Sequence, residues 1–254
     1  QEYFMELVYG DQPAGWSIAG QKEVIRNLGR EDFIKYRNQH YLAQATTLVI
    51  AGGFDEKNIM TEVQKRFGMF PGGVKGAKEK VKEYQEKPAE LIKFKESDQT
   101  HLVLGFRAFG IFDERRFALQ VLANVLGGGM SSRLFQKIRE ELGAAYYVNA
   151  SADLYSDHGL FMMSAGVDNS KIETVIKAGL KEFIRFKEEL VDERELQKAK
   201  DHLIGNLFLS VETSDEIAYF YGGQDVMGLE LKLPEAIAEK IKEVINALCR
   251  REKL

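Results

Sequence analysis

The spacing of hydrophobic residues predicts several β-strands in this chain. Residues 101–109 alternate strictly, with Leu102, Leu104, Phe106 and Ala108 on one face, which is typical of a strand that buries one side. Residues 145–152 and 160–167 are predicted to form two further strands, joined as a hairpin around Asp157-His158-Gly159. Two shorter runs, the β-branched apolar residues 46–51 and residues 91–95, are also predicted to be strands.

Other segments carry helical signals. Helices are predicted at 31–40, from a glycine turn at 52–55 through about Phe67, at 113–126 and at 131–142. Three later helix starts have capping-box spacing, namely Ser170 with Glu173, Asp192 with Glu195, and Thr213 with Glu216. The helix after Asp192 places Leu196, Ala199, Leu203 and Leu207 on one stripe, which predicts a core-facing side. Locally paired strands and grouped helices predict an α+β fold, an antiparallel sheet with helices packed on one side.

Residues 71–90 interrupt this pattern. They contain Pro71 and three glycines, and their lysines are interleaved with glutamates. Hydrophobic residues are nearly absent, which favours a solvated linker over a basic binding patch. We therefore predict three parts, with residues 1–70 belonging to one domain, 71–90 forming the linker and 91–254 belonging to a second domain.

A short repeat suggests duplication. Lys22-Glu23-Val24-Ile25-x-x-Leu28-x-Arg30 recurs at residues 242–250, an offset of 242 − 22 = 220 residues. The first residues, Gln1-Glu2-Tyr3-Phe4-Met5, form neither a signal peptide nor a start methionine. Two copies of one unit are expected, with the chain truncated at both ends.

Composition narrows the function classes. The 254 residues carry a net charge of −4, which argues against nucleic acid as the main partner. No apolar run approaches the ~20 residues that span a membrane. Cys249 is the only cysteine, so no intramolecular disulfide can form. This slightly favours the cytoplasm and leaves the compartment open.

Histidines and a glycine run are the candidates for a metal or phosphate site. The four histidines, His40, His101, His158 and His202, are too far apart in sequence for a local metal motif. Gly127, Gly128 and Gly129 follow a predicted helix and lack the Gly-Lys-Ser/Thr of a phosphate loop. The glycine run is either a helix end that needs positive φ or a narrow, flexible loop along which a peptide could lie.

The segment that begins with these glycines is the most informative one. Residues 127–146 read GGGMSSRLFQKIREELGAAY. This resembles the C-terminal-half signature of the pitrilysin/insulinase and mitochondrial-processing-peptidase family of zinc metallopeptidases, a glycine loop followed by S-R-L-F and I-R-x-x-x-G-x-A-Y. The resemblance implies that Arg139 and, seven residues later, Tyr146 reach toward the zinc site of the other half and contact bound substrate.

That assignment is chemically reasonable. A guanidinium offers fixed donors to a substrate carbonyl, and a phenol can donate to the oxyanion of a tetrahedral intermediate. Without the motif, the simpler interpretation is that Arg139 pairs with a glutamate on the helix surface and that Tyr146 is a core aromatic.

The resemblance covers essentially the whole chain. Residues 9–15, 18–20 and 30–41 look like the latter part of the family's N-terminal domain, and 195–213 looks like the long helical pair of the second domain. It implies zinc in the full-length parent, held by an inverted H-x-x-E-H motif and a glutamate expected upstream of Gln1. No zinc ligand is expected here, and the chain alone should be inactive.

Two functions therefore stay open. The chain is either part of a zinc metalloendopeptidase that acts on peptides or unfolded polypeptides, or part of a non-catalytic family member that serves as a partner subunit or scaffold. A homodimer or a paired subunit is compatible with both.

Overall fold

The computed structural model describes residues 1–245, and these form two compact units. The sheet unit comprises Gln1, residues 88–209 and residues 232–245, and the helical unit comprises residues 2–87 and 210–231. The predicted division at 1–70, 71–90 and 91–254 stays a prediction.

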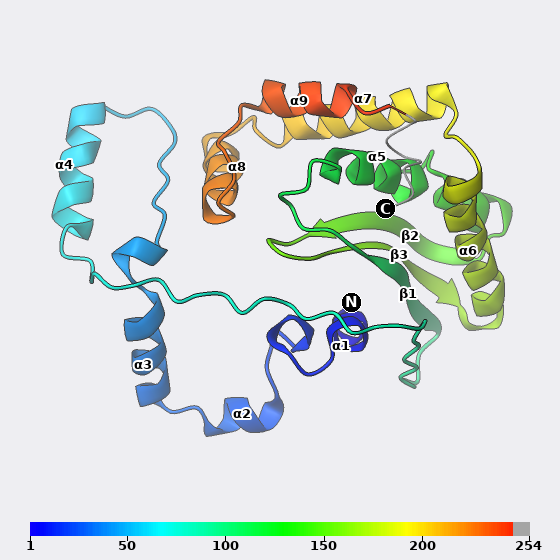
Figure 1. Ribbon diagram of the computed structural model, residues 1–254, viewed down its shortest axis with the longest axis horizontal. Coiled ribbons are helices and arrows are strands. Elements are labelled where there is room, and N and C mark those ends of the chain that lie inside the picture. Colours follow the sequence, from blue (N-terminus) through cyan, green and yellow to red (C-terminus); the bar gives the residue numbers. More distant parts are fainter. Residues whose placement is uncertain (246–254) are drawn as a thin grey trace. The chain divides into compact units, whose positions relative to one another are not determined.

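The sheet unit is built on three antiparallel strands, which confirms three of the predicted strands. Its order is β1 (Gln99–Ala108), β3 (Gly159–Asp168) and β2 (Ala145–Leu154), as Figure 1 shows. β2 and β3 form the expected hairpin. Leu104 of β1 and Ala150 of β2 both lie opposite Met163 of β3, so these residues share one face of the sheet.

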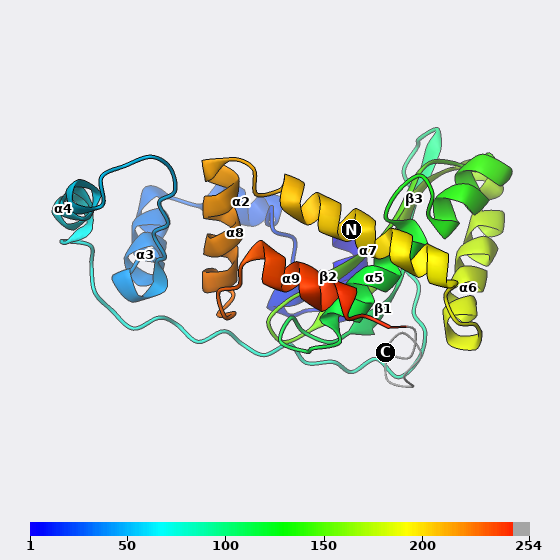
Figure 2. The same ribbon diagram turned by 90° about the horizontal axis from the view of Figure 1, so that it is seen from above.

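Helices cover that face. α5 (Arg116–Gly127) lies between the sheet and the pair α7 (Glu193–Leu209) and α9 (Pro234–Lys242), as Figures 1 and 2 show. α6 (Ile172–Glu188), preceded by the single turn η4 (Asn169–Lys171), packs its Gly179 against Met163 and Leu104. The expected sheet with helices on one side is confirmed.

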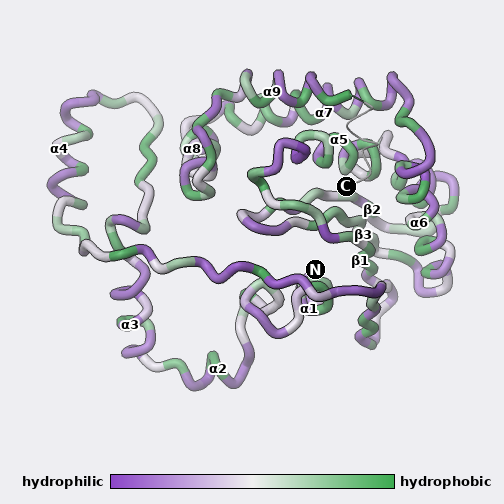
Figure 3. Tube along the Cα trace, in the orientation of Figure 1, coloured by the Kyte–Doolittle hydropathy of each residue, from purple (hydrophilic) through white to green (hydrophobic). Residues whose placement is uncertain are grey.

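The core of the sheet unit consists of two neighbouring clusters. Leu126, Leu134, Ile138, Met163 and Val175 are fully buried in the cluster between the sheet, α5 and α6. The second cluster joins α5 to α7 and α9 and includes the predicted stripe residues Leu196 and Ala199. Figure 3 shows hydrophobic colours gathered along α5 and alternating colours along α7 and α9, as expected for helices with one buried face.

The helical unit contains α1 (Glu2–Tyr9), α2 (Lys22–Asn27), α3 (Arg30–His40), α4 (Glu56–Phe67) and α8 (Ser214–Val226), together with the short turns η1 (Pro13–Gly15) and η2 (Ala43–Ala45). α3 and α4 match the predicted helices. Asp55 caps α4 by accepting a hydrogen bond from the Asn58 amide at 2.8 Å.

Two predicted strands, 46–51 and 91–95, are wrong. Both segments are irregular, and neither belongs to the sheet that the described residues form. Ile92 and Phe94 are exposed, at 83% and 96%. A hydrophobic run becomes a strand only where a neighbouring strand forms a hydrogen-bonded ladder with its backbone, and the three-stranded sheet of the described residues includes neither segment.

The predicted caps have three different outcomes. Thr213 and Glu216 form the expected capping box of α8. Asp192 accepts from the amides of Arg194 and Glu195 at the start of α7, but the Glu195 side chain pairs with Arg133 and does not complete the box. The Ser170 cap is wrong. Asp168 is the acceptor, and its hydrogen bonds from Ser170 lower the pKa of the Asp168 carboxyl.

The sequence repeat does not mark equivalent elements in the described residues. Its first copy begins α2 at Lys22, whereas its second copy begins at Lys242, where α9 ends. The rest of the second copy, like Cys249, lies outside the described residues. Within residues 1–245, no helix is both long and apolar enough to cross a membrane.

Candidate substrate-contact site

The glycine run at the end of α5 serves close packing. None of the three glycines has a positive φ, so the left-handed helix end considered from the sequence is wrong. A Cβ on Gly127 would overlap the backbone nitrogen of Ala150 in β2, and one on Gly128 would overlap the Asn124 side chain. Gly129 differs, because it is exposed and its nearest neighbour to such a Cβ, the His202 ring, is 3.8 Å away.

The loop after the glycines is closed by hydrogen bonds. The Ser132 amide and hydroxyl both donate to the Gly129 carbonyl, at 3.0 and 2.6 Å. The Gln136 side chain donates to the Met130 carbonyl at 2.7 Å. These bonds hold the loop against the first turn of the element that follows it.

That element, η3 (Phe135–Glu141), is a π-helix within the predicted helix 131–142. The Leu142 amide donates to the carbonyl of Lys137, five residues earlier, at 3.2 Å. Leu134 and Ile138 are fully buried, which anchors one side of η3 in the core. Arg139 lies in this π-helix.

A tight turn and a β-bulge then lead into β2. Gly143 has φ +52°, and its carbonyl accepts a hydrogen bond from the Lys171 ammonium at 2.9 Å. In the ladder with β3, Ala145 pairs with Val167 and Tyr147 with Gly166. Tyr146 is therefore the additional residue of a bulge, a feature that redirects side chains and is common beside active sites.

Arg139 and Tyr146 are both at the surface. The Arg139 guanidinium lies 5.0 Å from the Phe135 ring centroid, and no carboxylate within the described part of the chain pairs with it. Tyr146 is 56% exposed. Neither the glutamate pair nor the core aromatic of the simpler interpretation is present, and contact of these two residues with substrate stays a prediction.

The sheet face away from the helices holds a polar hollow that the sequence analysis did not identify. Its volume is about 670 Å³, and the residues that line it include His101, Tyr147, Asn149, Ser151 and Asp153. The His101 ring nitrogen Nδ1 lies 3.1 Å from the Tyr147 hydroxyl. The alternation of polar residues at 147, 149, 151 and 153 was the signal that could have shown it.

The described residues do not fit a zinc site. Residues 1–245 contain no group of three or more His, Cys, Asp or Glu side chains placed to hold a metal ion. The histidines have other neighbours. The His40 ring lies against the Tyr36 ring in a tilted arrangement, His158 contacts Asp157, and His202 contacts Asn124.

The arrangement matches a known family. Residues 27–203 match the sequence model of a protein family, which is described as the peptidase M16 inactive domain. The chain belongs to the peptidase M16 family. This confirms the family expected from residues 127–146.

The M16 chain is similar to curated bacterial proteins. It is 35% identical over 253 residues to an uncharacterized zinc protease of Rickettsia bellii, covering 96% of this chain and 58% of that protein. It is 29% identical over 251 residues to an uncharacterized zinc protease of Bacillus subtilis, covering 97% of this chain and 60% of that protein. The M16 chain thus spans about three fifths of the length of these relatives.

Solved structures support the M16 fold. A protease from Helicobacter pylori matches with a TM-score of 0.88 at 19% identity, over 98% of this chain and 61% of that one. A peptidase M16 inactive domain from Pseudomonas fluorescens matches with a TM-score of 0.84 at 22% identity, over 98% of this chain and 60% of that one. At these identities the likeness shows the α+β fold.

Proposed function

We propose that this M16 chain supplies the substrate-contacting, metal-free part of a zinc-dependent metallopeptidase that acts on peptides or unfolded polypeptides. Zinc is implied for the whole protein by the names of the relatives. It would be held by residues other than those described here. Arg139, Tyr146 and the exposed Gly129 of the glycine loop 127–129 would contact the peptide, while Gly127 and Gly128 pack beneath it.

One observation carries this proposal. Arg139 and Tyr146 are exposed on two irregular elements, a π-helix and a β-bulge, that flank the Gly143 turn. π-Helical turns and bulges both interrupt regular hydrogen bonding, and both are frequent at functional sites. Two such irregularities within a few residues, each presenting a polar side chain to solvent, are better explained by a shared contact than by packing.

The two side chains would have different roles. Arg139 has fixed donors that can hold a substrate carbonyl, and the stacked Phe135 ring limits where its guanidinium can lie. The Tyr146 hydroxyl can donate to an oxygen that gains negative charge as the peptide bond is attacked. Gly129 is exposed, and without a side chain it would let an extended peptide backbone approach the loop closely.

The test is an Arg139→Ala variant of the complete protein, assayed for peptide hydrolysis. Loss of a donor to the reacting group is expected to lower kcat/KM by on the order of 10²-fold. Arg194→Ala is the matched control, because Arg194 is also an exposed arginine of the sheet unit and lies at the start of α7. Equal hydrolysis by the Arg139→Ala and Arg194→Ala variants would refute the assigned role.

The same assay addresses the non-catalytic alternative. If the complete wild-type protein with added zinc binds unfolded polypeptide but hydrolyses none, the chain belongs to a partner subunit or scaffold. Hydrolysis that stops when a chelator removes the metal supports the peptidase.

A further inference from the structure

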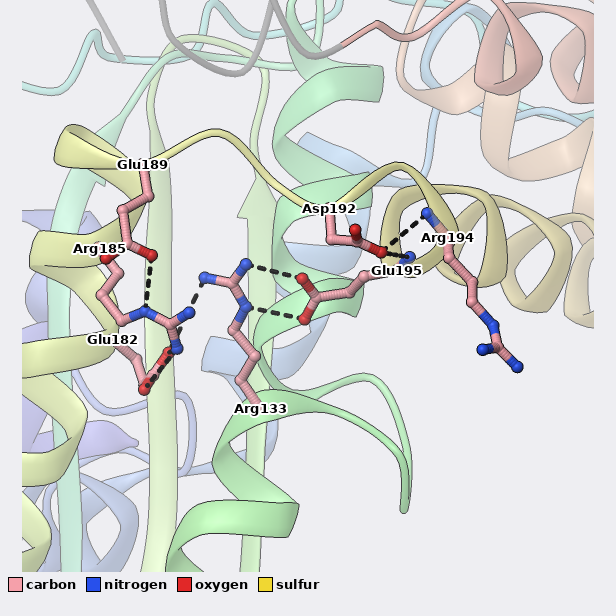
Figure 4. A network of polar contacts seen from close by, with 7 residues as sticks. All are labelled: Arg133, Glu182, Arg185, Glu189, Asp192, Arg194 and Glu195. Carbon is pink, nitrogen blue, oxygen red and sulfur yellow. Dashed lines mark hydrogen bonds and ion pairs between the residues drawn. The ribbon is translucent and has the colours of Figure 1, made fainter.

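Arg133 lies between the glycine loop and η3, and its side chain is only 9% exposed. Its Nε and Nη2 atoms donate to the two carboxylate oxygens of Glu195 in α7, at 2.8 and 2.7 Å. Figure 4 shows the two parallel bonds. The guanidinium carbon also lies 4.9 Å from the centroid of the Phe186 ring in α6. Arg133 therefore ties the loop to two helices.

The pair is part of a larger charge network. Glu182 of α6, with its side chain 9% exposed, places a carboxylate oxygen 3.8 Å from Arg133. Arg185 donates to Glu182 at 2.9 Å and to Glu189 at 3.1 Å. Two guanidinium and three carboxylate groups thus meet here, as Figure 4 shows. A guanidinium with a bidentate carboxylate partner has one well-defined position, because two of its N–H groups must point at the two oxygens at the same time.

This network lies at the start of η3, the element that carries Arg139. Leu134, the residue after Arg133, is the N-cap of η3, which begins at Phe135. Beyond the other end of η3, Lys171 donates to the Gly143 carbonyl at 2.9 Å. A π-helix holds one more residue in its hydrogen-bonded loop than an α-helix. A slip of one residue would turn the following side chains by about 100° around the helix axis. The direction of Arg139 depends on this register.

We propose that Arg133 is a positioning residue whose bidentate pair with Glu195 fixes the start and register of η3 and thereby directs Arg139 toward substrate. The link of this inference to activity rests on the proposed function. The stabilisation of η3 by Arg133 can be measured separately, by a method that needs no peptide hydrolysis. Arg133 itself is covered by α6 and α7 and acts through Arg139.

An Arg133→Lys variant tests the hold on η3. Lysine keeps the positive charge and loses the two-pronged geometry. Arg115→Lys is the matched control, because Arg115 makes the same two-bond pair with Asp113, at 2.9 and 2.6 Å, beside α5.

Hydrogen exchange of the full chain is followed on peptides that cover residues 134–143. We expect exchange there to become faster by on the order of tenfold in Arg133→Lys and to stay at the wild-type rate in Arg115→Lys. Equal protection in both variants overturns the inference.

A double-mutant cycle in the complete protein tests the link to activity. If Arg133 acts through Arg139, the variant that carries both Arg133→Lys and Arg139→Ala hydrolyses peptide about as fast as Arg139→Ala alone. Losses that multiply overturn the positioning role. If Arg139→Ala alone has no effect, the proposed function fails, and the exchange rates still decide whether Arg133 holds η3.

Discussion

Gly127 and Gly129 are two residues apart and face different constraints. Gly127 is buried, and a Cβ on it would overlap the Ala150 backbone. Gly129 is exposed, and a Cβ on it would lie 3.8 Å from its nearest neighbour, the His202 ring. Gly127→Ala is expected to lower the free energy of unfolding by about 1–3 kcal/mol through overpacking. Gly129→Ala should change it by no more than about 0.5 kcal/mol. Urea denaturation of both variants measures the difference, and equal stability would contradict the packing assignment.

At the residue scale, the sequence motif indicated Arg139 and Tyr146 as candidate contact residues but did not indicate their surroundings. The motif gave the residue numbers, because its spacing is visible in the chain. The bulge at Tyr146 could not be predicted, since a bulge exists only relative to the partner strand β3. The pair between Arg133 and Glu195 could not be predicted either, because the two residues are 62 positions apart in sequence.

At the scale of elements, the turn between η3 and β2 needs a glycine because of its backbone conformation. Gly143 has φ +52°, and a Cβ there would meet nothing within 4 Å. Gly143→Ala is therefore expected to destabilise the chain by about 1–2 kcal/mol. Gly205→Ala in α7, which would also meet nothing within 4 Å, should instead stabilise it by up to about 1 kcal/mol, because alanine favours helix. Thermal unfolding of the two variants should give shifts of opposite sign, and a shift of the same sign would be inconsistent with this explanation.

The elements that sequence predicted correctly are those whose signal is local. The hairpin of β2 and β3 pairs neighbours in the chain, and the capping box of Thr213 and Glu216 spans one helical turn. The segments 46–51 and 91–95 were predicted wrongly, because strand formation needs a partner that periodicity does not supply. The π-helical register of η3 could not be predicted either, since the hydrophobic pattern of residues 131–142 fits an α-helix as well as a π-helix.

At the scale of the whole chain, residues 71–90 are the predicted linker. They are exposed and lack regular structure, but their backbone is tied within the helical unit, where Gln44 accepts from Gly73 at 2.8 Å and Gln12 accepts from Lys82 at 2.9 Å. Brief trypsin digestion is expected to cut first after Lys75, Lys78 or Lys80, between the two tethers. Mass spectrometry identifies the site. A first cut within residues 91–245 would contradict the linker assignment.

The family and the α+β fold followed from one motif and the strand pattern, and both are confirmed. The activity of the whole protein does not follow from this chain, which spans 58% of the Rickettsia bellii relative. The role that we propose for this chain rests on two exposed side chains, Arg139 and Tyr146, and it can be tested on either.

Tyr146→Phe in the complete protein gives the most direct measurement, because it removes only the hydroxyl proposed to donate to the reacting oxygen. We expect kcat for peptide hydrolysis to fall by on the order of 10²-fold with KM nearly unchanged. Tyr219→Phe, at a tyrosine that is 82% exposed on α8, should keep the wild-type rate. A Tyr146→Phe enzyme as fast as Tyr219→Phe would contradict the account.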